Sequence, residues 1–144
     1  MSAHADTSYL VSLYTPDAKS VEASNLFTGA PPLSLTPFGE CEFVNALELR
    51  VFRKELEPAE ADAYLRAFQN DINEGLFVRR ALPATAYDRA MFLSRRHTRR
   101  LGTRGMDVLH VAIALELGVE FFYTFDRGQR RLARAAGLTV RPVH

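Results

Sequence analysis

The sequence predicts an α/β fold: a three-layer α/β/α sandwich around a mainly parallel sheet of about five strands. Along the 144 residues, short apolar runs alternate with longer segments of helical period. This alternation favours parallel strands joined by crossover helices. Hydrophobic residues make up 47% of the chain, and no repeat, low-complexity tract or linker divides it. We therefore expect one domain over residues 1–144.

Five short apolar runs are expected to form the strands. The first, SAHA, is weak because polar Ser2 and His4 interrupt it. The others are bounded by Pro, Gly or charged residues, which are typical of strand ends. The predicted strands cover residues 2–5, 33–35, 76–82, 119–125 and 138–143.

Helices are expected in the intervening segments. Thr36 is a typical N-cap, and Pro37 and Pro58 are typical of the first helical turn. Gly118 and Gly137 are typical of helix C-termini. The predicted helices cover residues 9–14, 21–27, 37–54, 58–75, 84–96, 105–117 and 126–136.

Charge is divided unevenly along the chain. Residues 1–75 hold five Lys or Arg against twelve Asp or Glu, whereas residues 76–144 hold thirteen against five. Sixteen of the eighteen basic residues are Arg, whose planar guanidinium suits phosphate and carboxylate. An anionic partner fits this pattern, and so does a solvated basic surface.

The single cysteine excludes an internal disulfide and a Cys-rich zinc site. The N-terminus lacks the succession of charged, apolar and small residues that marks a signal peptide. The most apolar stretch, VLHVAIALELGVEFFYTF, is interrupted by His and Glu, so no membrane span is expected. These features predict a cytoplasmic protein.

Four acidic residues lie where predicted strands end or helices begin. Asp126 ends the run FFYTF, Asp6 follows the first strand, and Glu42 and Asp107 lie in the first turns of helices. Open parallel sheets bind ligands at the carboxyl ends of their strands. Each acid alone could be a helix cap or a complement to a helix dipole. Together they would repel one another, which implies a shared cation, and hard carboxylate oxygens suit Mg²⁺ or Mn²⁺.

Four longer stretches contain these acids: ADTSYLVSL, TPFGECEFVNAL, LGTRGMDVLHVAIALELG and FFYTFDRGQRRLARAAGL. In order and spacing they resemble PIN-domain proteins, specifically the VapC-type toxin nucleases of bacterial toxin–antitoxin pairs. Glu40 competes with Glu42, but Glu42 carries the family's spacing to Ala46 and Leu47. The weak first strand departs from the family's aliphatic run.

The resemblance implies that Asp6, Glu42, Asp107 and Asp126 bind one or two divalent metal ions, Mg²⁺ or Mn²⁺, and that the enzyme cleaves RNA. It also implies that Thr124 points its hydroxyl toward the acids or an attacking water. A VapB-type antitoxin and a toxin homodimer are the protein partners that it suggests.

Other polar residues have two interpretations each. His110 lies three residues after Asp107 on the same helical face, so it is either a further ligand or a core histidine with a hydrogen-bond partner. The arginines beside the acids either hold RNA phosphates or form a solvated surface. They are Arg95, Arg96, Arg99, Arg100 and Arg104, with Arg127 beside Asp126.

Three alternatives to a ribonuclease remain open. ADTS resembles half of the motif of aspartyl-nucleophile phosphatases, but Ser8 stands where that chemistry wants a second acid. A receiver-type signalling module needs a late lysine, and the only lysines are Lys19 and Lys54. The third alternative is a non-catalytic RNA-binding or regulatory protein in which the acids are structural.

Overall fold

A five-stranded parallel sheet lies at the centre of the computed structural model, which describes residues 2–144. The strand order is β3-β2-β1-β4-β5. This confirms the predicted α/β class and the parallel sheet. The strands are β1 (Ala3–Ala5), β2 (Leu33–Leu35), β3 (Phe77–Arg79), β4 (Phe121–Tyr123) and β5 (Thr139–Arg141).

The strand predicted to be weak, β1, is the central strand. It pairs with β2 on one side and with β4 on the other, with His4 opposite Ser34 and Phe122. Backbone pairing on both edges therefore supports a segment whose side chains are poor strand formers. Ala3 and Ala5 join the core on one face of the sheet, and the His4 ring lies against Phe122.

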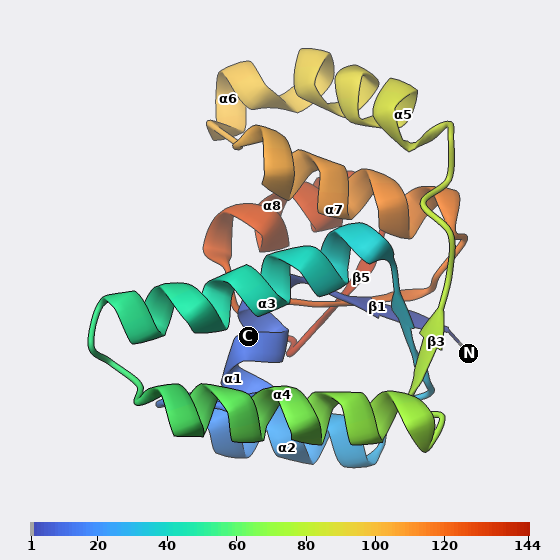
Figure 1. Cartoon of the computed structure of the whole chain (residues 1–144). Coiled ribbons are helices and arrows are strands. Elements are labelled where there is room, and N and C mark those ends of the chain that lie inside the picture. The colour runs from blue at the N-terminus through green and yellow to red at the C-terminus, as the bar shows by residue number, and fades with distance from the viewer. Residues whose placement is uncertain (1) are drawn as a thin grey trace.

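Helices cover both faces of the sheet (Figure 1). As predicted, Pro37 and Pro58 begin helices, and the Thr36 Oγ1 atom accepts the first-turn N–H of Gly39 at 3.2 Å. No helix within residues 2–144 is long and apolar enough to cross a membrane. The helices are α1 (Thr7–Tyr14), α2 (Ser20–Thr28), α3 (Pro37–Phe52), α4 (Pro58–Asn73), α5 (Ala86–Leu93), the π-helical turn η1 (Ser94–Thr98), α6 (Arg99–Leu101), α7 (Gly105–Glu116) and α8 (Arg127–Ala135).

The predicted bounds need two corrections. The helix predicted over 84–96 continues through η1 and α6 to Leu101, and Gly102 then takes the left-handed conformation with φ 67°. The strands predicted over 76–82, 119–125 and 138–143 shrink to three residues each. The outer residues of these runs lie beyond the three-residue ladders of the sheet.

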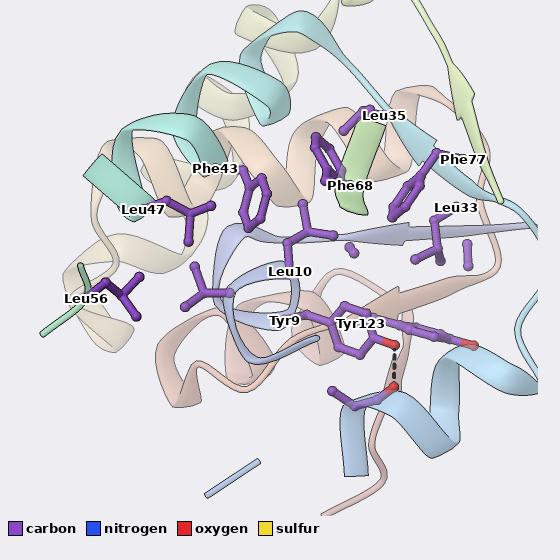
Figure 2. Packing of buried hydrophobic residues seen from close by; sticks show 14 residues of the cluster. Tyr9, Leu10, Leu33, Leu35, Phe43, Leu47, Leu56, Phe68, Phe77 and Tyr123 are labelled. Carbon is purple, nitrogen blue, oxygen red and sulfur yellow. Dashed lines mark hydrogen bonds between the residues drawn. The ribbon is translucent and has the colours of Figure 1, made fainter. Parts of the chain in front are cut away.

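The core has a larger part on one face of the sheet and a smaller part on the other. The larger part joins strand residues to α1, α3 and α4, and includes Leu10, Phe43 and Phe68 (Figure 2). In it, the Tyr9 hydroxyl donates to the Ala23 carbonyl at 2.9 Å, which ties α1 to α2. The smaller part packs α7 and α8 on Phe122 and Val140. Both parts hold the carboxyl ends of β1 and β4 in place.

Candidate functional site

Two of the predicted acids follow neighbouring parallel strands. Asp6 follows β1 and Asp126 follows β4 after Thr124 and Phe125. The Asp6 N–H donates to the Tyr123 carbonyl at 3.0 Å, so the β1–β4 ladder extends to the first acid. Both acids are N-caps: Asp6 accepts from the Tyr9 N–H and begins α1, and Asp126 begins α8.

The carboxylate of Asp6 is fully buried and has three hydrogen-bond donors. Its Oδ1 atom accepts from the Ser8 hydroxyl at 2.7 Å and from the Tyr9 N–H at 3.0 Å. Its Oδ2 atom accepts from the Thr124 hydroxyl at 2.5 Å. Burial raises the pKa of Asp6, and the nearby His110 and the hydroxyl donors oppose that rise. The fold thus places the Asp6 carboxylate where burial makes its ionised form less favourable.

Thr124 connects the ends of the two strands. Its hydroxyl donates to Asp6, and the same oxygen accepts the backbone N–H of Asp126 at 2.9 Å. Ser8 adds a second connection, because its Oγ accepts the N–H of Phe125 at 3.1 Å. The predicted orientation of Thr124 toward the acids agrees with this geometry. Ser8 was not predicted as part of the network.

Glu42 approaches the same region from α3. Its Oε1 atom accepts from the Thr7 hydroxyl at 2.9 Å and lies in hydrogen-bond contact with His110 Nε2. Burial pushes the pKa of Glu42 upward, but the hydrogen bond and charge of His110, together with Thr7, outweigh burial and hold it below its usual value. His110 is therefore the buried partner of Glu42, which agrees with the interpretation as a hydrogen-bonded core histidine.

A second buried histidine, His4, lies near His110. The His4 ring is buried, and its centroid is 6.1 Å from that of His110. Burial and the neighbouring His110 lower the pKa of His4 to about 3, so His4 is uncharged at neutral pH. Neither ring nitrogen of His4 has a hydrogen-bond partner within residues 2–144.

Asp107 and Asp126 are connected by α8. Asp126 Oδ1 accepts the N–H of Gln129 at 2.8 Å, and the Gln129 side chain donates to Asp107 Oδ1 at 3.2 Å. Burial raises the pKa of Asp107, and the charge of Asp126 adds to the rise, with a smaller contribution from Glu42. The negative charges of Asp126 and Glu42 therefore act on Asp107.

The donor set fits a hard divalent cation. The four predicted ligands are carboxylates, the oxygen donors that Mg²⁺ and Mn²⁺ prefer. Burial raises the pKa of Asp6, burial and the charge of Asp126 raise the pKa of Asp107, and a cation would relieve both costs. Within residues 2–144, no three acidic, His or Cys side chains lie close enough together, as they stand, to hold one ion. Binding would thus require the side chains to turn inward.

Glu40, the alternative to Glu42, lies outside this cluster. Its carboxylate forms an ion pair with Arg79 at 3.0 Å, between the start of α3 and the end of β3. Thr7 and Gln129, by contrast, were missed by sequence reasoning, although they contact predicted acids. The signal for Thr7 was its position directly after Asp6.

The predicted phosphate-binding arginines are all exposed. Arg99 and Arg100 lie on the short helix α6, Arg104 precedes α7, and Arg127 follows Asp126. None of the ion pairs found within residues 2–144 uses any of the four. Of the four, Arg104 acts on a predicted acid, because its charge opposes the rise in the pKa of Asp107.

Comparisons with known proteins give a family and several similar folds. The PIN domain family matches residues 5–135, and no curated protein matches the chain. VapC20 from Mycobacterium tuberculosis, described as a sarcin–ricin loop cleaving toxin, is 22% identical with a TM-score of 0.69, over 96% of this chain and 97% of that one. FitAcB from Neisseria gonorrhoeae is 14% identical with a TM-score of 0.70, over 96% and 95%.

A third structure, VapBC2 from Rickettsia felis bound to a DNA fragment from their promoter, is 14% identical with a TM-score of 0.66, over 98% of each chain. At these identities the likeness shows the fold. The family match covers nearly all of the chain and contains all four acids. This protein is therefore a member of the PIN-domain family.

Proposed function

We propose that this protein is a metal-dependent endoribonuclease and the toxin component of a type II toxin–antitoxin system. One observation supports the proposal most: Asp6 and Asp126 follow the neighbouring strands β1 and β4, and the charges of Asp126 and Glu42 raise the pKa of Asp107 beside them. PIN domains are typically nucleases that use divalent metals. The similarity to VapC20, a toxin that cleaves an RNA loop, supports RNA as the substrate.

In this proposal the four carboxylates hold Mg²⁺ or Mn²⁺. Such an ion polarises a phosphodiester, lowers the pKa of water and neutralises the leaving oxygen. The chain's own residues set the geometry. Thr124 and Ser8 fix the Asp6 carboxylate, His110 and Thr7 fix Glu42, and Gln129 fixes Asp107.

The arginines have a separate role in the proposal. Arg99, Arg100, Arg104 and Arg127 are exposed beside an acidic cluster that would repel RNA on its own. Guanidinium groups bind phosphate oxygens in pairs of hydrogen bonds. We assign these four residues to the RNA backbone.

RNA cleavage by the purified protein tests this function. Cleavage should require Mg²⁺ or Mn²⁺, stop in EDTA and disappear in Asp107→Asn. Cleavage at full rate in EDTA would remove the metal from the mechanism. RNA binding without cleavage under any metal would favour the non-catalytic alternative, and hydrolysis of small phosphate esters with no action on RNA would favour the phosphatase.

The proposed protein partner is a small antitoxin of the VapB type. The support is the likeness to FitAcB and VapBC2 over nearly the whole chain. An antitoxin Arg that enters the carboxylate cluster would form strong charge-assisted hydrogen bonds and compete with the metal. Co-expression with the product of the adjacent reading frame should give a stable complex in which RNA cleavage is suppressed. Failure to form any complex would leave a ribonuclease without the toxin–antitoxin role.

A further inference from the structure

All the basic residues of α8 lie on one side of the helix. They are arginines spaced by three and four residues, which places them on one helical face. These residues, which we call the basic face of α8, are Arg127, Arg130, Arg131 and Arg134. The opposite side of the helix is buried in the core through Leu132 and Ala133.

Nothing in α8 balances the charge of this face. The helix contains no acidic residue after its N-cap, Asp126. None of the ion pairs found within residues 2–144 uses any of the four arginines. Like charges three and four residues apart destabilise a helix, and a cation in the first turn opposes the helix dipole. A pattern that is unfavourable for the helix itself indicates an anionic ligand.

Arg130 connects the basic face to the carboxylate site. Its guanidinium donates to the Thr124 carbonyl at 3.2 Å and to the Pro142 carbonyl at 2.6 Å. The Thr124 hydroxyl donates in turn to Asp6. Hydrogen bonds therefore fix α8 against the strand end that carries the proposed metal ligands, and Asp126 at the start of α8 is one of those ligands.

Arg127 and Arg131 are available to a ligand. Both are exposed, and no hydrogen bond of either side chain is found in the part of the chain that the structure describes. They lie four residues apart, a rise of about 6 Å along the helix, which is comparable to the step between neighbouring phosphates of a nucleic-acid strand. Arg127 directly follows Asp126. A strand whose cut bond lies at the carboxylates would thus place its next phosphates beside these side chains.

We propose that the basic face of α8 holds the RNA backbone on one side of the cut bond, with Arg127 and Arg131 bound to successive phosphates. The inference rests on the proposed ribonuclease function and deepens it, because it gives the substrate a path from the carboxylates along α8. Guanidinium groups suit phosphate oxygens, and contacts to the backbone position a nucleic acid without reading its sequence.

The alternative anion is an acidic segment of a protein partner. RNA is favoured by where the face begins. Arg127 lies beside a proposed metal ligand, where the phosphates of the substrate itself have to lie during cleavage. The salt dependence of binding separates the two, because each phosphate contact releases counterions from the RNA.

Arg131→Ala tests the path without changing a proposed metal ligand. Affinity for labelled single-stranded RNA of about twelve nucleotides is measured by fluorescence anisotropy in EDTA, in the Asp107→Asn background so that the RNA is not cut. One lost phosphate contact lowers the slope of log affinity against log salt by about 0.7. Arg131→Ala should therefore bind about eightfold more weakly than the parent at about 50 mM salt and about threefold more weakly at about 200 mM.

Two further variants serve as controls. Arg66 is an exposed arginine of α4, which packs in the other part of the core, and none of the ion pairs found within residues 2–144 uses it. Arg66→Ala should stay within about twofold of the parent at both salt concentrations. Arg131→Lys keeps the positive charge, so it should keep the salt slope of the parent. A variant that only damaged α8 would not be rescued in this way.

The outcomes separate this inference from the proposed function. Equal salt slopes for Arg131→Ala and Arg66→Ala would overturn the inference, as would a parent protein that binds no RNA. Unchanged RNA affinity in Arg131→Ala with loss of the complex with the product of the adjacent reading frame would assign the face to a protein partner instead. If the wild type cuts RNA but Arg131→Ala behaves as its control, the ribonuclease stands without this path. If the wild type never cuts RNA and Arg131→Ala still lowers the slope, the RNA path stands and the catalytic proposal fails.

Discussion

Two substitutions of Asp126 separate its role as a helix cap from its role as a charge. Its Oδ1 atom accepts the Gln129 N–H at 2.8 Å at the start of α8. Asparagine keeps an acceptor oxygen in that place, whereas alanine removes it. Loss of an N-cap costs about 1 kcal/mol, which corresponds to a melting temperature lower by about 3 °C in a domain of this size.

Charge changes stability in the opposite direction. The carboxylate of Asp126 raises the pKa of Asp107, so the two destabilise each other when both are ionised. Asp126→Asn removes this repulsion and keeps the cap. In EDTA it should therefore unfold at or above the wild-type temperature, and Asp126→Ala should unfold about 3 °C below Asp126→Asn.

Magnesium supplies the third comparison. A ligand present at ten times its Kd and bound only by the folded state adds about 1.4 kcal/mol, or about 4 °C here. The wild type should gain this in Mg²⁺ and both variants should gain much less, with RNA cleavage lost in both. The assay is thermal unfolding with and without Mg²⁺, paired with cleavage. If Asp126→Asn has the same melting temperature as Asp126→Ala in EDTA and still cuts RNA, Asp126 is a structural residue and the reasoning is wrong.

Three further perturbations test other parts of the molecule. Asp107→Asn should abolish cleavage. Because the pKa of Asp107 is raised in the folded state, the metal-free wild type should lose stability as pH rises above the ordinary value of 3.8. Urea unfolding should show a smaller loss over the same pH range in Asp107→Asn. Tyr9→Phe removes a 2.9 Å hydrogen bond in the core and should cost about 1 kcal/mol in urea unfolding with cleavage unchanged. Burial and two neighbouring arginines lower the pKa of His97, so the wild type should lose stability as pH falls below 6.5, and His97→Gln should lose less.

Local signals were enough to predict the α/β class and the positions of the acids. Proline at the first turn of α3 and α4 and glycine after α7 fix where elements begin and end. Once strands and helices alternate, a parallel sheet gathers the strand ends at one edge. The positions of Asp6 and Asp126 at strand ends were predictable for that reason: Asp6 directly follows β1, and Asp126 lies three residues after the end of β4.

Contacts between distant segments were not predictable in the same way. His110 and Glu42 are separated by 68 positions, and nothing in either helix alone specifies their contact. The local sequence pattern does not specify the order of the strands in the sheet. The weak run around His4 therefore gave no sign that it forms the central strand. The predicted strand lengths were wrong for a related reason: the runs continue beyond Tyr123 and Arg79, where the paired ladder ends.

The cap and the metal ligand are not competing interpretations of Asp6 and Asp126. In a parallel sheet, the residue after a strand is also the residue before a helix, so one Asp can accept a helical N–H and still face the sheet edge. Three hydrogen-bond donors hold the Asp6 carboxylate in this geometry. Two of its three donors, Ser8 and Thr124, are hydroxyls whose hydrogens can rotate, whereas the third is a fixed backbone N–H. If a cation bound at this edge, the backbone N–H of Tyr9 would still hold the Asp6 carboxylate, because only the two hydroxyl donors would have to turn away.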